Sequence, residues 1–164
     1  MKKRLYKKGA PFRDARLFVI ACEGEKREKE YFEHFNSLSQ RIKIKVLDHI
    51  SPGHSAPKWI LSKAASYAEE YALGKDDQLW LVMDTDRWRR EVFTEIQHHC
   101  SSNNWNMAIS NPCFEVWLYM HIQAISKAKA NDCKRLKAEL DSLISGGYNV
   151  KTFISKIDTA IFNA

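Results

Sequence analysis

The chain has 164 residues, of which 45% are hydrophobic and 28% are charged, which is the composition of one globular domain with its own core. Its longest apolar runs, such as residues 17–21 and 79–83, are far shorter than the roughly 20 residues that a membrane-spanning helix needs. No apolar segment follows the basic N-terminus before Leu17, which argues against a secretory signal. We therefore expect a cytoplasmic protein with no membrane partner.

The net charge of +6 is concentrated at the N-terminus. Residues 1–16 contain seven basic residues and one acidic residue, whereas the rest of the chain has 19 of each and is formally neutral. Such a basic arm can bind phosphate without sequence preference by releasing counterions. A solvated and partly disordered terminus explains the pattern equally well. We expect a flexible arm over residues 1–16 and a single domain over residues 17–164.

The cysteine pattern indicates neither a metal cluster nor a disulfide framework. Cys22, Cys100, Cys113 and Cys133 form no CxxC pair and have no histidine partner at zinc spacing. Disulfides are also rare in cytoplasmic proteins. We therefore expect four buried free thiols.

Strand and helix patterns alternate along the first half of the chain. Residues 17–21 form a continuous apolar run, typical of a strand that is covered on both faces. Residues 25–38 carry an aromatic stripe on one helical face. Alternating apolar and basic residues over 42–46 predict a half-exposed, peripheral strand. Residues 57–73 then predict a helix that begins with proline and ends before Gly74.

The second half repeats this alternation. Residues 79–83 form another continuous apolar run, and Asn111 is placed as a helix N-cap with Pro112 at the first helical position. The remaining patterns predict a short strand over residues 106–109 and helices over residues 90–100, 112–121, 132–144 and 150–162. Together they predict an α/β three-layer sandwich with a mostly parallel central sheet of about four strands flanked by helices. Ligands of such sheets bind at the carboxyl ends of the strands.

Acidic residues follow each of the two buried-type strands. Glu23 comes after the first strand, and Asp84 and Asp86 come after the later one. Because the carboxyl ends of parallel strands open on the same edge, we expect these residues to converge. Three neighbouring carboxylates would repel one another unless a cation neutralised them, and Mg²⁺ prefers hard oxygen ligands. Alternatively, a carboxylate beyond a strand is only a turn former or a helix N-cap, and an isolated DxD motif often arises by chance.

Three segments of the chain resemble one protein family: FVIACEGEKREKEYFEHF, LWLVMDTDRW and AISNPCFEVWLYMH. A strand followed by Glu-Gly, with a later strand that ends in Asp-x-Asp, resembles the Toprim fold of topoisomerases, bacterial primases and OLD-family nucleases. More specifically, the segments resemble the RloB family, Toprim-type proteins of bacterial restriction and abortive-infection loci that often accompany an ATPase. The resemblance covers residues 17–121 and implies a Toprim-like (Rossmann-like) fold. The longer chains of the family imply that this domain is truncated at its C-terminus.

The resemblance also implies roles for acidic residues. Glu23, Asp84 and Asp86 would be the catalytic residues and would coordinate Mg²⁺ or Mn²⁺. Glu25 is a further candidate ligand, although a glutamate at a helix start can equally compensate the helix dipole. Glu115 in the third segment is another candidate, and an ordinary exposed helix position is the alternative.

Polar and basic residues beside these carboxylates are candidates for binding phosphate. Asn111 belongs to the third segment and can reach the same edge of the sheet, although helix capping alone is favoured for it. Five basic residues flank the acidic ones, and any one of them alone is more typical of plain surface: Lys26, Arg27, Arg87, Arg89 and Arg90.

We therefore predict a Mg²⁺-dependent nuclease of anti-phage defence that hydrolyses RNA, including tRNA, or DNA and works with an ATPase partner. The alternative is a catalytically weak regulatory or scaffold subunit of an ATPase-containing defence complex. DxD motifs also occur in nucleotide-sugar transferases and in haloacid-dehalogenase-type phosphatases. The upstream Glu-Gly, and the absence of threonine two residues after Asp86, argue against both. The chain has no glycine-rich P-loop, so we expect no ATP hydrolysis by this domain.

Overall fold

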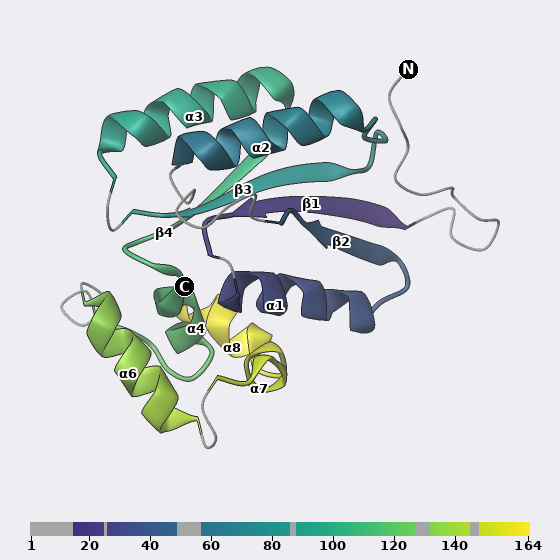
Figure 1. The fold of residues 1–164 in the computed structure, drawn as a ribbon. Coiled ribbons are helices and arrows are strands. Elements are labelled where there is room, and N and C mark those ends of the chain that lie inside the picture. The colour runs from purple at the N-terminus through teal and green to yellow at the C-terminus, as the bar shows by residue number, and fades with distance from the viewer. Residues whose placement is uncertain (1–14, 25, 49–56, 86–87, 127–131, 145–147) are drawn as a thin grey trace. The chain divides into compact units, whose positions relative to one another are not determined.

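The computed structural model describes residues 15–24, 26–48, 57–85, 88–126, 132–144 and 148–164 (Figure 1). The basic arm expected over residues 1–16 lies almost wholly outside the described residues. Contacts group the chain into two compact units, Met1–Val82 with Arg89–Ala108, and Met83–Trp88 with Ile109–Ala164. The expectation of a single domain over residues 17–164 stays a prediction.

Within the described residues, the sheet has four parallel strands in the order β2-β1-β3-β4. Its strands are β1 (Arg16–Cys22), β2 (Ile42–Val46), β3 (Gln78–Asp84) and β4 (Asn106–Ser110). β1 pairs with β2 as far as Ile20 opposite Val46, and with β3 as far as Cys22 opposite Val82. The predicted α/β class with a parallel sheet of about four strands is confirmed.

Helices cover both faces of this sheet, which explains why residues 17–22 of β1 and 79–83 of β3 are all apolar. Figure 1 shows α1 (Arg27–His34) on one face and α2 (Pro57–Glu70) with α3 (Arg90–Asn103) on the other. Val19 and Ala21 are fully buried on one side of β1, and Ile20 and Cys22 are buried on the other. β2 is an edge strand in which Lys43 is exposed, as its alternating pattern predicts.

The aromatic stripe of α1 packs on the sheet as expected. Phe32 contacts a buried cluster on three strands that contains Ile20, Cys22, Val46 and Val82. Next to it, the buried ring of Tyr31 meets Phe32 edge-on, with the two ring centroids 5.4 Å apart. Each large apolar side chain buried in this way contributes about 1.5–3 kcal/mol to stability. This packing fixes the helix that follows Glu23.

The second unit is helical. Its elements are α4 (Phe114–Met120), α6 (Cys133–Leu143), α7 (Val150–Ile154) and α8 (Ile157–Asn163). α4 contacts both α6 and α8, and Leu118 and Tyr119 are fully buried. His121, which ends α4, is also fully buried and lies edge-on to the rings of Trp117 and Phe153. A helix that is buried nearly all round forms the centre of its unit.

Several predicted helix boundaries were wrong. α3 runs to Asn103 rather than to residue 100. α2 ends at Glu70 rather than at residue 73, because the chain turns towards β3 earlier. There Asp77 accepts hydrogen bonds from the backbone N–H of Gly74 at 2.7 Å and of Leu17 at 3.0 Å, which ties the turn to β1. The helix expected over residues 150–162 is two short helices, because the Lys156 N–H bonds the Phe153 carbonyl at 2.9 Å in a tighter turn. The glycine pair 146–147 lies outside the described residues.

No helix within the described residues is long and apolar enough to cross a membrane.

Candidate functional site

Glu23 directly follows β1 and continues its pairing with β3. Its backbone N–H donates to the carbonyl of Val82 at 3.2 Å, and its side chain is partly exposed. A Cβ on Gly24 would overlap the carboxylate of Glu28, so the glycine leaves room for this α1 side chain to fold back over the turn. Glu23 is thus held at the carboxyl end of a central strand by main-chain contacts.

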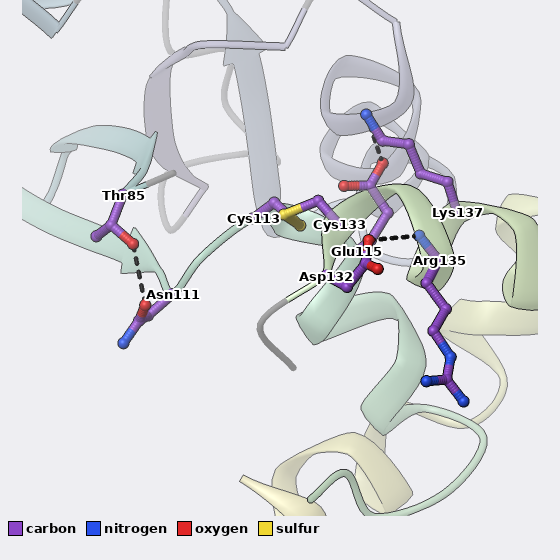
Figure 2. The surroundings of a disulfide bond; sticks show 8 residues. All are labelled: Thr85, Asn111, Cys113, Glu115, Asp132, Cys133, Arg135 and Lys137. Carbon is purple, nitrogen blue, oxygen red and sulfur yellow. Dashed lines mark hydrogen bonds and ion pairs between the residues drawn. A yellow bond between two sulfur atoms is a disulfide. The ribbon is translucent and has the colours of Figure 1, made fainter. Parts of the chain in front are cut away.

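Asp84 is the last residue of β3, and the turn after it is tied to the third sequence segment. The backbone N–H of Thr85 donates to the carbonyls of Ser110 at 3.0 Å and Pro112 at 2.9 Å. Its hydroxyl donates to Oδ1 of Asn111 at 3.0 Å (Figure 2). The structure therefore brings the Asp-Thr and Asn-Pro segments together within the second unit.

Asn111 does not cap a helix, which corrects the sequence-based expectation. α4 begins at Phe114 with Cys113 as its N-cap, and the Asn111–Pro112 peptide bond is cis. Cys113 has an extended backbone (φ −147°, ψ 163°), so the chain becomes helical two residues after Pro112. Asn111 instead accepts the hydrogen bond from Thr85 and is exposed. A role in binding phosphate stays a prediction.

Glu115 is buried rather than an ordinary exposed helix position, so this alternative was wrong. Its side chain lies in the first turn of α4, and Oε1 is 3.5 Å from Nζ of Lys137 on α6 (Figure 2). A buried carboxylate is stable when an ammonium group and the positive end of a helix dipole neutralise it. This pairing gives Glu115 a clear structural role between two helices, while the metal role stays a prediction.

The expectation of four free thiols was wrong for two of the cysteines. Cys113 and Cys133 form a disulfide with a Cα–Cα distance of 6.2 Å (Figure 2). Cys22 and Cys100 are buried free thiols. Asp132 caps α6 beside the disulfide by accepting the N–H of Arg135 at 2.9 Å. The two cysteines lie 20 residues apart and meet only because α6 packs on α4. Local spacing therefore carried no signal of the pair.

The basic candidates are surface residues where the structure describes them. Lys26 is exposed just before α1, Arg27 is partly exposed as its first residue, and Arg89 and Arg90 are exposed at the start of α3. Three predicted site residues lie outside the described ranges: Glu25, Asp86 and Arg87. The convergence of Glu23 with Asp84 and Asp86 stays a prediction.

The two described strand-end carboxylates are each a hard oxygen ligand of the kind that Mg²⁺ prefers. Glu23 directly follows β1, Asp84 is the last residue of β3, and both side chains are partly exposed. Mg²⁺ is usually held by one or two carboxylates, several waters and substrate phosphates. Among the described residues, no three His, Cys, Asp or Glu side chains form a group that could hold a metal ion. The described residues alone therefore do not make a closed, all-protein metal site.

Sequence analysis missed a group of charged residues at the carboxyl end of β2. Lys63 of α2 donates to the carbonyl of Leu47 at 2.7 Å, and Lys29 of α1 forms an ion pair with Asp48. Partial burial lowers the pKa of Lys63, although Asp48 favours its charged form. Their positions in the sequence give no sign of this proximity, because each comes from a different element.

A model of the family described as RloB-like protein matches residues 18–164. The match extends past residue 121, where the resemblance of the three segments ends. No curated protein and no solved structure gives a significant match. The family match covers nearly the whole chain and includes both strand-end carboxylates and the Asn-Pro segment. The chain therefore belongs to the RloB-like family.

Proposed function

We propose that this protein is a Mg²⁺- or Mn²⁺-dependent nuclease with a Toprim-like site, in which Glu23, Asp84 and Asp86 hold the metal against a nucleic-acid phosphate. The observation that carries the proposal is the register of β1 with β3. The two strands pair in parallel up to Cys22 and Val82, so that one strand ends beside Glu23 and the other two residues later at Asp84.

The strand order also supports a site at the carboxyl ends of β1 and β3. In the order β2-β1-β3-β4, the chain moves outward to β2 on one side of β1 and to β4 on the other side of β3. The boundary between β1 and β3 is therefore the switch point of the sheet. Open α/β sheets bind their ligands at the carboxyl ends of the strands at this point.

Each residue has a chemical task in the proposed reaction. When bound, a divalent cation stabilises negative charge on phosphate oxygens and lowers the pKa of water. Asp84 and Asp86 have the i, i+2 spacing that puts both side chains on one side of an extended chain. They would fix the position of the metal, while Glu23 would complete the coordination or accept a proton from the attacking water. Glu25 would be an additional ligand.

Substrate and partners follow from the family resemblance. The substrate class would be RNA, including tRNA, or DNA, cleaved at the phosphodiester bond. Lys26, Arg27, Arg87, Arg89 and Arg90 would bind neighbouring phosphates. Restriction and abortive-infection loci imply a cytoplasmic role in anti-phage defence beside an ATPase.

The test is metal-dependent cleavage by the purified chain. Mg²⁺ and Mn²⁺ are titrated with labelled tRNA, single-stranded RNA and plasmid DNA as substrates. Because metal stabilisation of the transition state amounts to several kcal/mol, Asp84→Asn/Asp86→Asn should lower cleavage by about 100-fold or more. The matched control is Asp76→Asn, which removes an exposed carboxylate before β3 and should cleave like the wild type. Equal loss in the control, or cleavage without added metal in the presence of EDTA, would contradict the proposal.

A second function has support from the surface of α8. Ile161 and Phe162 are large apolar residues with exposed fractions of 63% and 90%. Exposed apolar side chains of this size are typical of contact surfaces for protein partners. A scaffold subunit would still bind its ATPase after Asp84→Asn/Asp86→Asn and would lose it after Phe162→Ser. Protection of cells against phage that persists with Asp84→Asn/Asp86→Asn but is lost with Phe162→Ser would favour the scaffold function.

A further inference from the structure

Three lysines from three elements lie around Asp48 at the carboxyl end of β2. Lys29 of α1 forms an ion pair with Asp48, and Nζ of Lys45 lies 3.8 Å from its Oδ2. Lys63 of α2 is close enough to Asp48 for the carboxylate to favour its charged form. We call Lys29, Lys45 and Lys63 the strand-end lysine cluster. All of its residues belong to the first unit, as does Glu23.

Lys63 is held over the strand ends by the main chain. Its ammonium donates to the carbonyl of Leu47 at 2.7 Å, and the N–H of Leu47 donates to the carbonyl of Ile20 on β1 at 2.8 Å. Leu47 thus continues the pairing of β2 with β1 by one residue, and Lys63 lies at the carboxyl edge of these two strands. Cys22, the last residue of β1, interacts electrostatically with the same ammonium.

The charge of Lys63 is poorly compensated by its surroundings. Burial raises the pKa of Cys22 to about 12, so this neighbour is a neutral thiol at physiological pH. Partial burial is the main cause that lowers the pKa of Lys63, Asp48 opposes this shift, and Lys29 and Lys45 add to it. Lys29, in contrast, has Asp48 as its partner and also interacts with Glu33. Lys63 therefore gains most from an added anion.

The ion pairs of Asp48 leave room for such an anion. Its side chain is 64% exposed, and exposed ion pairs of this kind contribute little to stability. Lys29 and Lys45 can therefore exchange part of their contact with Asp48 for another oxyanion at low cost. Lysine suits phosphate because its ammonium is a compact charge with three donors.

We propose that the strand-end lysine cluster, with Lys63 as its central contact, binds a phosphodiester group of the nucleic-acid substrate. This inference rests on the proposed nuclease function and names the place of a second phosphate. β2 lies one strand spacing, about 4.8 Å, from β1, which ends at Cys22, directly before Glu23. A strand of nucleic acid whose scissile phosphate lies at Glu23 would thus place a neighbouring phosphate at the cluster.

The experiment measures binding of fluorescein-labelled single-stranded RNA and DNA to the full chain in EDTA, where metal-dependent cleavage is absent. Lys63→Gln keeps an N–H donor for Leu47 and removes the charge. It should raise Kd about tenfold at 0.1 M salt and reduce the slope of log K against log salt by about 0.7. Lys63→Arg keeps the charge and should bind within about twofold of the wild type.

Lys43→Gln is the matched control for loss of charge. Lys43 is exposed on β2 and pairs in register with Leu17, near the amino end of β1, so its loss should change Kd by less than about twofold. Equal Kd values for Lys63→Gln and Lys43→Gln would overturn the inference. A melting temperature of Lys63→Gln well below that of Lys63→Arg, with equal RNA affinity per folded molecule, would also overturn it.

Two further arms separate this inference from its rivals. Inorganic phosphate is titrated against wild type and Lys63→Gln; a loss of phosphate binding with unchanged RNA affinity would assign the cluster to a free anion and contradict the inference. Metal-dependent cleavage by the wild type is measured separately. Absence of metal-dependent cleavage would refute only the proposed nuclease function. An unchanged RNA Kd in Lys63→Gln would refute only the proposed phosphate-binding role of the lysine cluster.

Discussion

The two units of this protein are stabilised in different ways. The first has strands of five to seven residues, two helices of 14 residues and one of 8, and its apolar side chains are buried between sheet and helices. The second has helices of 5 to 11 residues, which are joined by the Cys113–Cys133 disulfide and by the ion pair of buried Glu115 with Lys137. Isolated helices this short are marginal in water. The second unit therefore depends more on individual links between residues far apart in the sequence.

The largest expected effect comes from the core of the first unit. Leu81 lies in β3 and is fully buried, so Leu81→Ala should lower the free energy of unfolding by about 2–5 kcal/mol. The control Leu143→Ala removes a leucine that is 49% exposed on α6 and should cost well under half as much. Urea unfolding followed by circular dichroism measures both. Equal effects would contradict the claim that burial at the sheet dominates the first unit.

Removal of the disulfide tests whether the second unit depends on individual links between distant residues. Cys113→Ser/Cys133→Ser should destabilise the second unit by about 3 kcal/mol, because opening a loop of 20 residues restores chain entropy to the unfolded state. Hydrogen exchange should show faster exchange in α4 and α6, while the amides of β1 and β3 remain protected.

Cys100→Ser is the matched control, since it changes a free thiol of the first unit. It should leave exchange in α4 and α6 unaltered. Uniform loss of protection across both units after removal of the disulfide would show that they unfold together and would break the comparison.

The buried ion pair should have a smaller effect. Lys137→Gln leaves the carboxylate of Glu115 buried without this ammonium, and should cost about 1 kcal/mol because the lysine side chain is 54% exposed. Lys134→Gln, at an exposed position on the same helix, should be neutral. Thermal unfolding measures the difference in melting temperature between the two variants. Identical melting temperatures would show that the ion pair does not stabilise this unit.

The smallest expected effect concerns the link from β3 to the Asn-Pro segment. Thr85→Val removes the hydroxyl that donates to Asn111 and should cost about 0.5 kcal/mol, because this hydrogen bond is exposed to water. If the proposed metal site is correct, the same variant should weaken Mn²⁺ affinity in a titration, because the turn after Asp84 loses one of its contacts. Thr94→Val, in which the lost hydroxyl bonds only along α3, serves as the control. An unchanged Mn²⁺ affinity in Thr85→Val would show that the hydrogen bond from Thr85 to Asn111 contributes to stability and not to metal binding.

Local patterns were enough to predict most of the first unit. The continuous apolar run at residues 17–21 correctly predicted a central strand, and the alternation at residues 42–46 correctly predicted an edge strand. Both predictions succeed because the spacing of apolar residues shows which faces of a strand are buried. The same patterns failed at Asn111, which has the sequence of a helix N-cap but accepts a hydrogen bond from Thr85. The competing partner lies 26 residues away and is invisible to local capping rules.

The sequence by itself determined the α/β class, the parallel sheet and the placement of Glu23 and Asp84 at strand ends, because these depend on periodicity and on residues next to buried strands. Only the tertiary structure decided which cysteines pair, that Glu115 is buried with Lys137, and that Lys63 meets Leu47 and Asp48. Such contacts join elements far apart in the chain. These contacts depend on how the helices pack against one another and against the sheet. The sequence alone does not select them, because each of these residues could pair with many others.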